Sequence, residues 1–454
     1  MNEGKIGTDL TSGPVLPQLL RFVVPLLLAN LIQQLYNSVD TMVIGLVEGS
    51  AGTAGVSNGG ETVTLLTFIA ISFGSAAQVY VSQLSGAGDR KKVGEVLGTL
   101  LSLVFLLSVV FTLLSLALCA PVLDWLNCPP EALSEARDYM LIASLGLPFI
   151  FGYNALAGFM RGLGESSRPL AFIAVAAVAN VFLDLLLVVV IPLASAGTAI
   201  ATAVSELAAF LAASLFLYRR RKQLGFELSL RSFIVRKDHL RVILRLAIPL
   251  SAQSAFIHLT QLICTAQINT FGLAASATNS IGNKIQRLIT VFITSTSTGA
   301  GAMVGQNIGA GKLERVRKIV HATLLCTAVP GLIGFFVCLF LPRQAFSLFT
   351  KDPEVIELGI TYLRVTVVLM LLSPIQSSYM SVVTGTGNAK LSFLAGMLDG
   401  VVLRLGFSFL LAYTFGMGVL GFFLGNVLAR LGPIAVSLSY YLSGRWRTYK
   451  LLQG

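Results

Sequence analysis

QLSGAGDRKKV, residues 83–93, has a counterpart in the second half of the chain, QNIGAGKLERV, residues 306–316. Both stretches follow a long apolar run, and both place Gly-Ala-Gly before a basic segment. Further matches keep the same order at an offset of 223 or 224: Gln83 with Gln306, Val93 with Val316, Gly162 and Gly164 with Gly385 and Gly387, and RFVVP (21–25) with RLAIP (245–249). Matches in one order along the whole chain predict two halves with the same fold.

The composition is that of a membrane protein. Of 454 residues, 55% are hydrophobic and only 12% are charged, with a mean hydropathy of +0.81. Soluble domains are nearer a quarter charged, so much of this exterior is expected to face a lipid bilayer. The net charge of +11 would suggest nucleic acid in a soluble protein, but basic cytoplasmic loops explain it here, and we expect no nucleic-acid partner. The five cysteines show neither zinc-ligand spacing nor a disulfide framework, and we expect no cleavable signal peptide.

Apolar stretches of roughly 20 residues are long enough to cross a bilayer as helices. We expect about twelve such spans, at residues 17–46, 58–84, 93–120, 136–161, 168–192, 194–218, 240–269, 276–307, 316–342, 355–384, 391–413 and 416–443. The sequence therefore predicts an all-α polytopic membrane protein with a six-helix lobe at 1–218, a basic linker at 219–239, a second six-helix lobe at 240–443 and a tail at 444–454.

Basic residues gather in alternate loops, most densely in RRRK at 219–222, while the opposite loops carry acids such as Glu48, Asp124 and Asp352. Loops rich in Lys and Arg stay in the cytoplasm, so we expect both termini there, in a multi-pass protein of the inner membrane. Six spans per half make the repeats parallel. That arrangement predicts a pseudo-twofold axis along the membrane normal and a central cavity between two bundles.

Enzyme signatures are weak or absent. GAGKLER (309–315) resembles a phosphate loop only faintly, because Leu313 stands where Ser or Thr is needed, and a helix-capping turn explains it better. His239, His258 and His321 are far apart in sequence. We expect no enzyme activity and no cofactor.

An acid inside a membrane span is the more informative feature. A charged carboxylate at the bilayer centre costs about 2.5–3.5 kcal/mol or more, so such residues are rare and usually functional. Asp40 lies in the first span, with a polar stripe one and two turns before it that must face protein or water: Gln33, Tyr36 and Asn37.

A second acid, Asp184, lies in the fifth span with Asn180 one turn earlier, and the sixth span offers Thr202 with Glu206 on the same face. Carboxylate, amide and hydroxyl oxygens would suit Na⁺, and a desolvated pair of carboxylates could instead carry protons. The plainer alternative is that each acid only makes interhelical hydrogen bonds.

The second half lacks these acids. Cys264 corresponds to Asp40, and the counterpart of Asp184, near Gly406, is not acidic. Asp399 in the eleventh span has Arg404 five residues on, which indicates either a neutralising pair or a cavity role. Lys284 and Arg287 could snorkel or line the cavity mouth.

A proline at matched positions in both halves, Pro25 and Pro249, falls inside an apolar run. A bend at Pro25, some four turns before Asp40, could couple the charge of that acid to the shape of the first helix. A static kink or a helix start is the alternative.

The chain resembles the multidrug and toxic compound extrusion (MATE) family, in its prokaryotic MepA- and DinF-like branch. The residues that carry the resemblance are QQLYNSVDTMVIG (33–45), the two repeated loops, AGFMRGLGESSRP (157–169) and NVFLDLLLVVVIPLASAGTAIATAVSE (180–206). It implies twelve helices in two lobes, and export of cationic, amphipathic compounds in exchange for H⁺ or Na⁺. It also implies a cation site in the N-terminal lobe at Asp40, Asn180, Asp184 and Thr202. The NorM-like branch uses acids in helices seven and ten, where this chain has Ala255 and no mid-span carboxylate.

The resulting hypothesis is a monomeric secondary antiporter of organic cations that works by alternating access. Gln33, Tyr36, Asn37, Glu206 and Asp399 are further candidates for the cavity or for coupling. A flippase for a lipid-linked precursor, from the same broad superfamily, is the alternative. A membrane-embedded enzyme is the third class considered, but the sequence shows no nucleophile or metal cluster for it.

Overall fold

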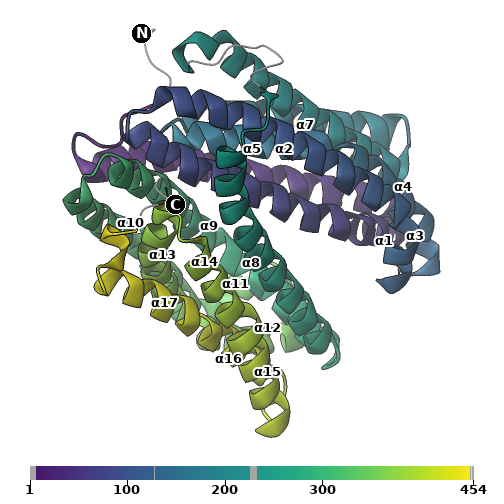
Figure 1. The fold of residues 1–454 in the computed structure, drawn as a ribbon. Coiled ribbons are helices and arrows are strands. Elements are labelled where there is room, and N and C mark those ends of the chain that lie inside the picture. The colour runs from purple at the N-terminus through teal and green to yellow at the C-terminus, as the bar shows by residue number, and fades with distance from the viewer. Residues whose placement is uncertain (1–6, 127, 225–232, 450, 452–454) are drawn as a thin grey trace. The chain divides into compact units, whose positions relative to one another are not determined.

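The structure is a computed structural model that describes residues 7–126, 128–224, 233–449 and 451. Within these ranges every regular element is a helix (Figure 1). The helices follow the apolar runs of the sequence because a helix satisfies all its backbone hydrogen bonds internally, which a lipid environment demands.

The chain forms two compact units of similar size. The N-terminal unit consists of Met1–Asp9 and Val24–Ala247, and the C-terminal unit of Leu10–Val23 and Ile248–Gly454. Neither unit is one continuous stretch of the chain, whereas the sequence suggested continuous lobes at 1–218 and 240–443. The first turns of the first span belong to the C-terminal unit, and the first turns of the seventh span belong to the N-terminal unit.

The first half of the chain is drawn in purple to teal in Figure 1. Its α-helices are α1 (Val15–Gly86), α2 (Arg90–Ala117), α3 (Cys119–Trp125), α4 (Leu133–Leu145), α5 (Leu147–Gly162), α6 (Ser167–Asp184) and α7 (Ala194–Arg219). Two short 3₁₀ helices, η1 (Pro130–Ala132) and η3 (Arg221–Leu224), and a π-helix, η2 (Leu185–Val190), complete this half. Helix α7 packs against α4, α5 and α6.

The second half begins with long helices and ends in shorter pieces. Its α-helices are α8 (Lys237–Asn269), α9 (Leu273–Gly309), α10 (Leu313–Phe340), α11 (Pro342–Ser347), α12 (Pro353–Thr366), α13 (Leu369–Thr386), α14 (Ala389–Met397), α15 (Gly406–Phe409), α16 (Val419–Ala429) and α17 (Leu431–Leu442). The π-helices η5 (Leu398–Leu405) and η6 (Leu410–Thr414) flank α15, and η7 (Arg445–Arg447) is a 3₁₀ helix. Helix α13 packs against α9, α10 and α17.

The described helices include ten stretches long and apolar enough to span a membrane, and two bent pairs raise the number to twelve. The predicted all-α membrane fold is thus confirmed. Helix α1 contributes two spans, because Gly49 breaks it with φ 64° and ψ −143°. The loop expected at residues 47–57 is accordingly much shorter, with the second span starting at Gly52.

The two bent pairs occupy corresponding places in the two halves. The fourth span bends by 49° between α4 and α5, and the tenth span bends by 41° between α12 and α13. The sequence predicted one span at each place, at residues 136–161 and 355–384. Gly146 and Pro148 interrupt the fourth span. Proline has no backbone N–H, which costs nothing in the first turn of α5 but prevents α4 from continuing through this position.

The N-terminal segment is fixed to the start of α10 within the C-terminal unit. Lys312 Nζ donates to the Thr11 carbonyl at 2.9 Å, and the Arg315 guanidinium donates to the carbonyls of Ser12 and Gly13. Leu10 is 1% exposed and donates its N–H to Gln306 Oε1. These contacts explain why residues 10–23 belong to this unit.

Candidate functional site

Four polar residues from three helices meet inside the N-terminal unit, and we call them the acid site: Asp40, Asn180, Asp184 and Thr202. Asp40 lies on the first span of α1, Asn180 and Asp184 lie on α6, and Thr202 lies on α7. The Asp40 carboxyl has the side chains of Asp184, Asn180 and Thr202 as its immediate polar neighbours. The structure thus brings together the four residues that the sequence singled out.

The acid site is enclosed and much of its hydrogen-bonding capacity is unused. Asp40 is 7% exposed, and Asn180 and Asp184 are 0% exposed. Six atoms have no hydrogen-bond partner among the described residues: Asp40 Oδ1, both Asp184 oxygens, both amide atoms of Asn180 and Thr202 Oγ1. A buried polar group without a partner costs about 1–3 kcal/mol, and more when it is charged. The acid site therefore gathers six unsatisfied polar atoms in one enclosed place.

The local fold explains why Asp184 stays inside. Directly after it, α6 changes into the π-helix η2, whose residue Val188 packs with Val43 and Ile44 of α1. π-Helical turns inside α-helices are rare and occur frequently at functional sites. The apolar cluster lies one turn beyond Asp40 on α1 and one turn beyond Asp184, so it encloses that end of the acid site.

Tyr139 is a site residue that sequence reasoning missed. It lies on α4 and interacts electrostatically with Asp40 and Asp184, and its hydroxyl is next to Thr202. Helix α4 is held against the start of α7, because Ser195 donates its N–H to Glu135 Oε2 at 3.1 Å and its hydroxyl to the Glu135 carbonyl. Glu135 is one turn before Tyr139, so this contact fixes the part of α4 that carries Tyr139.

The other candidates of the first span divide into two groups. Tyr36 is buried and its hydroxyl donates to Glu206 Oε1 at 3.5 Å, while Gln33 lies beside Tyr36. Asn37 is exposed and is not among the polar neighbours of Asp40. Of the expected polar stripe, Gln33 and Tyr36 therefore lie near Glu206, and Asn37 does not take part.

Glu206 forms a second buried acid centre one turn beyond Thr202 on α7. It is 8% exposed, and its Oε2 atom has no hydrogen-bond partner in the part of the chain that the structure describes. Tyr153 is its neighbour on α5, and Arg161 lies near Tyr153 while its Nε donates to Gln78 Oε1 at 2.8 Å.

Pro25 lies inside α1, in a stretch whose described backbone is helical apart from Gly49. It is the second residue after the point where α1 passes from the C-terminal to the N-terminal unit. It is about 22 Å from Asp40 along the helix, at a rise of about 1.5 Å per residue.

The remaining candidates belong to the C-terminal unit. Asp399 is 2% exposed and its Oδ1 atom is 2.9 Å from Arg404 Nη2, so the two form a buried ion pair. Lys284 and Arg287 are exposed on α9, and His258 is half-buried on α8.

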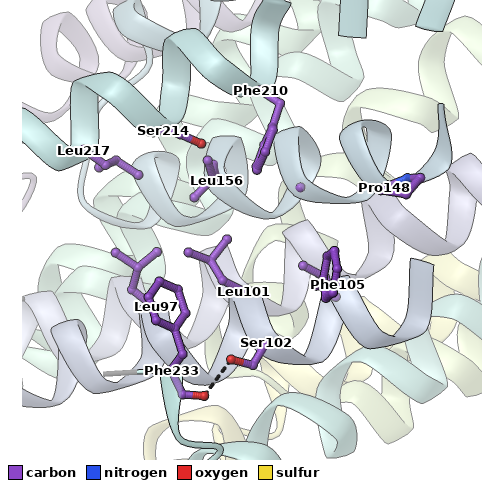
Figure 2. Close-up of a pocket in the computed structure, with 12 residues that line it drawn as sticks. Leu97, Leu101, Ser102, Phe105, Pro148, Leu156, Phe210, Ser214, Leu217 and Phe233 are labelled. Atoms are coloured by element: carbon purple, nitrogen blue, oxygen red, sulfur yellow. Dashed lines mark hydrogen bonds between the residues drawn. The ribbon is translucent and has the colours of Figure 1, made fainter. Parts of the chain in front are cut away.

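A cavity of about 500 Å³ lies elsewhere in the N-terminal unit (Figure 2). Leu97, Leu101 and Phe105 of α2 line one wall, and Leu156 and Phe210 line the other. The lining is mostly apolar. One of its polar residues is Ser102, whose hydroxyl donates to the Phe233 carbonyl at 2.7 Å. The acid-site residues do not line this apolar cavity. In the described ranges no three His, Cys, Asp or Glu side chains are grouped as a metal site would require.

Known proteins resemble this chain over most of its length. Among curated proteins, it is 27% identical over 445 residues to the probable multidrug resistance protein YpnP of Bacillus subtilis, covering 98% of each chain. It is 23% identical over 390 residues to the multidrug export protein MepA of Staphylococcus aureus, covering 86% of each chain.

Solved structures share the fold. A transporter of the MOP superfamily from Pyrococcus furiosus superposes with a TM-score of 0.89 at 22% identity, covering 100% of both chains. An outward-facing multidrug resistance MATE transporter gives the same values. Identity at this level establishes the fold alone.

The sequence model of the MatE family matches residues 25–186 and again residues 249–410. The two stretches have equal length and stand at the offset of the internal repeat, one in each half, and together they cover most of the chain. The chain therefore belongs to the MatE family and is a membrane transporter rather than an enzyme.

Proposed function

We propose that this protein is a secondary active antiporter that exports amphipathic organic cations in exchange for H⁺ or Na⁺. The acid site is where the coupling cation binds. The observation that carries the proposal is the set of buried polar atoms on Asp40, Asn180, Asp184 and Thr202 that no described residue satisfies. The names of the relatives YpnP and MepA, both multidrug proteins, favour a multidrug substrate range.

The chemistry of the acid site suits a cation. The polar side chains around Asp40 and Asp184 in the described structure are each other, Asn180, Thr202, Tyr36 and Tyr139, and none of these is basic. Two enclosed carboxylates without a counter-charge repel each other, and either a proton or Na⁺ removes that repulsion. Na⁺ is a hard ion that prefers oxygen ligands, and the site offers carboxylate, amide and hydroxyl oxygens.

Coupling requires that cation binding alters helix α1. Asp40 and Tyr36 are one turn apart on α1, so the acid site and the Glu206 centre both act on the same helix. Neutralisation of Asp40 would release α1 from its interaction with α6 and α7, and Pro25 supplies the point at which the helix can bend. In this scheme organic cation and coupling cation bind to the N-terminal unit alternately.

Orientation follows from the loops. With both termini in the cytoplasm, the basic segments around residues 90–92, 219–222 and 312–318 would lie on the cytoplasmic side of the inner membrane. Helix α1 would then carry Asp40 from the cytoplasmic face to the interior of the membrane.

Gradient-driven efflux tests the proposal. Proteoliposomes loaded with a fluorescent organic cation receive an imposed proton gradient or sodium gradient in separate experiments. We expect efflux in the wild type under at least one gradient, and a loss of tenfold or more in Asp40→Asn and Asp184→Asn. Asp124→Asn, an exposed acid on α3, is the matched control and should transport like the wild type.

Equal efflux by wild type, Asp40→Asn and Asp184→Asn would remove the coupling role of the acid site. Gradient-independent behaviour with every organic cation tried, in a well-folded preparation, would favour the lipid-linked-precursor flippase instead.

A further inference from the structure

The C-terminal unit contains a cluster of two arginines and one carboxylate, of which Arg404 and Asp399 are buried and Arg430 is partly exposed. Asp399 Oδ1 lies 2.9 Å from Arg404 Nη2, and Asp399 Oδ2 lies 3.8 Å from Arg430 Nη1. Arg404 also donates to Asn426 Oδ1, and Arg430 donates to Gln376 Oε1 at 3.3 Å. The side chains of Arg404 and Asp399 are 5% and 3% exposed, and that of Arg430 is 29% exposed.

Two members of this cluster stand at repeat positions of the first-half acid region. Arg404 corresponds to Asn180 of the acid site, and Arg430 corresponds to Glu206. The two family matches, at residues 25–186 and 249–410, stand at an offset of 224 residues. The same offset, extended beyond the first match, pairs residues 202 and 206 as well. The pairs are Asp40 with Cys264, Asn180 with Arg404, Asp184 with Ser408, Thr202 with Asn426, and Glu206 with Arg430.

Packing supports this correspondence independently of sequence matching. A Cβ atom on Gly197 would meet the backbone of Leu187, and one on Gly421 would meet the backbone of Leu411 and its neighbour. Gly421 and Leu411 are the repeat counterparts of Gly197 and Leu187, so the same two helices approach closely in both units. π-Helical segments also recur there, with η2 after Asp184 and η6 shortly after its counterpart.

The counterparts are neighbours in space as well. The Cys264 side chain interacts with Arg404 and Ser408, and Gly425 packs directly against Ser408. Tyr362 interacts with Arg404, much as Tyr139, at nearly the same place in the first half, interacts with the two acids. We call Asp399, Arg404, Ser408 and Arg430 the arginine site.

The arginine site has the opposite polarity to the acid site. Two guanidinium groups and one carboxylate leave a formal net charge of +1. Three hydrogen-bond donors have no acceptor among the described residues: Arg404 Nε, Arg430 Nε and Ser408 Oγ. Asp399 therefore neutralises the cluster only in part, and a buried charge without compensation is strongly unfavourable.

We propose that the arginine site binds one small monovalent anion, a halide ion such as chloride. One negative charge balances the formal charge, and N–H and O–H groups are the donors that such an anion accepts from. The burial of Arg404 and Ser408 favours a single ion over a larger group, since a bulky anion would have to displace packed helices.

Thermal unfolding of the purified protein in detergent tests this, because a ligand that binds only the folded state raises the melting temperature. Chloride replaces gluconate stepwise while sodium concentration and ionic strength stay constant, so that the acid site does not contribute. We expect a rise in melting temperature that saturates with chloride in the wild type and in Asp184→Asn.

Three variants locate the effect. Arg404→Gln lowers the formal charge of the cluster to zero and should abolish the saturable response. Ser408→Ala, which keeps all charges and should fold even where Arg404→Gln does not, should weaken chloride affinity about tenfold, as expected from loss of one hydrogen bond to a charged group. Ser437→Ala is the matched control, since this buried serine is satisfied by the Pro433 carbonyl and should respond like the wild type.

Identical melting curves in chloride and gluconate for the wild type would overturn the proposal. A chloride response that persists unchanged in both Arg404→Gln and Ser408→Ala would do the same, because it would be a general salt effect. The melting temperature reports chloride binding and not transport. The outcome therefore does not depend on whether the protein transports organic cations.

Discussion

Asp184 shows how function and stability oppose each other at a single residue. Its side chain is fully buried and neither carboxylate oxygen has a partner among the described residues, so ionising this carboxyl in the folded protein is costly. Asp40 beside it adds repulsion between like charges. Natural proteins accept such costs mainly where a site needs an unsatisfied group.

Asp184→Asn should therefore raise the melting temperature of the purified protein in the absence of coupling cations. The substitution keeps the shape of the side chain and removes a carboxyl group whose oxygens are buried without partners. We expect its removal to stabilise the fold by about 1–3 kcal/mol. The same variant should lose any stabilisation by Na⁺ or by acid that the wild type shows. A melting temperature below that of the wild type in cation-free buffer would contradict this view of the acid site.

Tyr139→Phe tests whether the hydroxyl beside Thr202 contributes to cation binding. The ring remains to pack on α7, so the fold should be intact, but the acid site loses a polar group. We expect the apparent affinity for the coupling cation to fall about tenfold with maximal efflux little changed, as for the loss of one hydrogen bond to a charged group. Tyr218→Phe, at the far end of α7, is the control, and equal behaviour of the two variants would exclude a role for Tyr139.

At the scale of elements, close helix crossings determine where the spans lie. A Cβ atom on Gly158 of α5 would be 2.0 Å from the Gly74 carbonyl oxygen on α1, so the two backbones touch. Small residues at such crossings let helices approach in membranes, where apolar burial alone gives little drive to association.

Gly158→Ala should destabilise the protein by about 1–3 kcal/mol, because an added methyl group has to push two helix backbones apart. Gly406→Ala is the matched control: no atom of the described chain lies within 4 Å of a Cβ atom there, and its melting temperature should be unchanged or slightly higher. Thermal unfolding monitored in the same detergent measures both. Similar melting temperatures for the two variants would be evidence against the close crossing.

Asp89 caps helix α2, and the contribution of this cap to the free energy of unfolding depends on pH. Its Oδ1 accepts from the Lys92 N–H at 3.1 Å, and its Oδ2 is 2.9 Å from Lys92 Nζ. The Lys92 side chain and amide hold the pKa of Asp89 below its ordinary value. A lowered folded-state pKa means that the stabilisation is complete above the ordinary value, about 3.9, and disappears as the pH falls through the lowered one.

Asp89→Ala should accordingly lower the melting temperature at neutral pH through loss of a cap worth about 1 kcal/mol. The difference from the wild type should narrow below about pH 4, where the aspartate is being protonated. Asp89→Asn keeps a capping oxygen and should show a smaller loss at neutral pH. A difference that stays constant down to pH 3 would show that the charge of Asp89 does not contribute.

At the scale of the whole molecule, the sequence predicts the spans well because each one is a long apolar run. It also identified Asp40 and Asp184, since a carboxylate in such a run is costly. Their proximity did not follow from spacing, because the first, fifth and sixth spans are far apart in the chain. It was expected because these spans belong to one six-helix lobe, and the family resemblance implied the same group. Tyr139 stayed hidden because a tyrosine in a span is ordinary.

Other features depend on tertiary contacts that no local pattern records. The attachment of residues 10–23 to the C-terminal unit depends on Lys312 and Arg315, which look like ordinary loop cations in the sequence. The sequence shows the internal repeat, but it does not show that basic side chains gather at the repeat position in the second half. Only the structure shows that Arg404 and Arg430 come together at the position where the first half has Asn180 and Glu206.

The most direct test of the acid site is the exchange of cations on the purified protein itself. An organic cation is added to the protein in weakly buffered detergent solution, and proton release and the loss of bound radioactive Na⁺ are measured in parallel. We predict that the wild type releases about one coupling cation per bound organic cation, and that Asp40→Asn and Asp184→Asn bind no exchangeable cation. Binding of the organic cation without release of either H⁺ or Na⁺, or unchanged release by both variants, would contradict the assignment of the acid site as the place where the coupling cation binds.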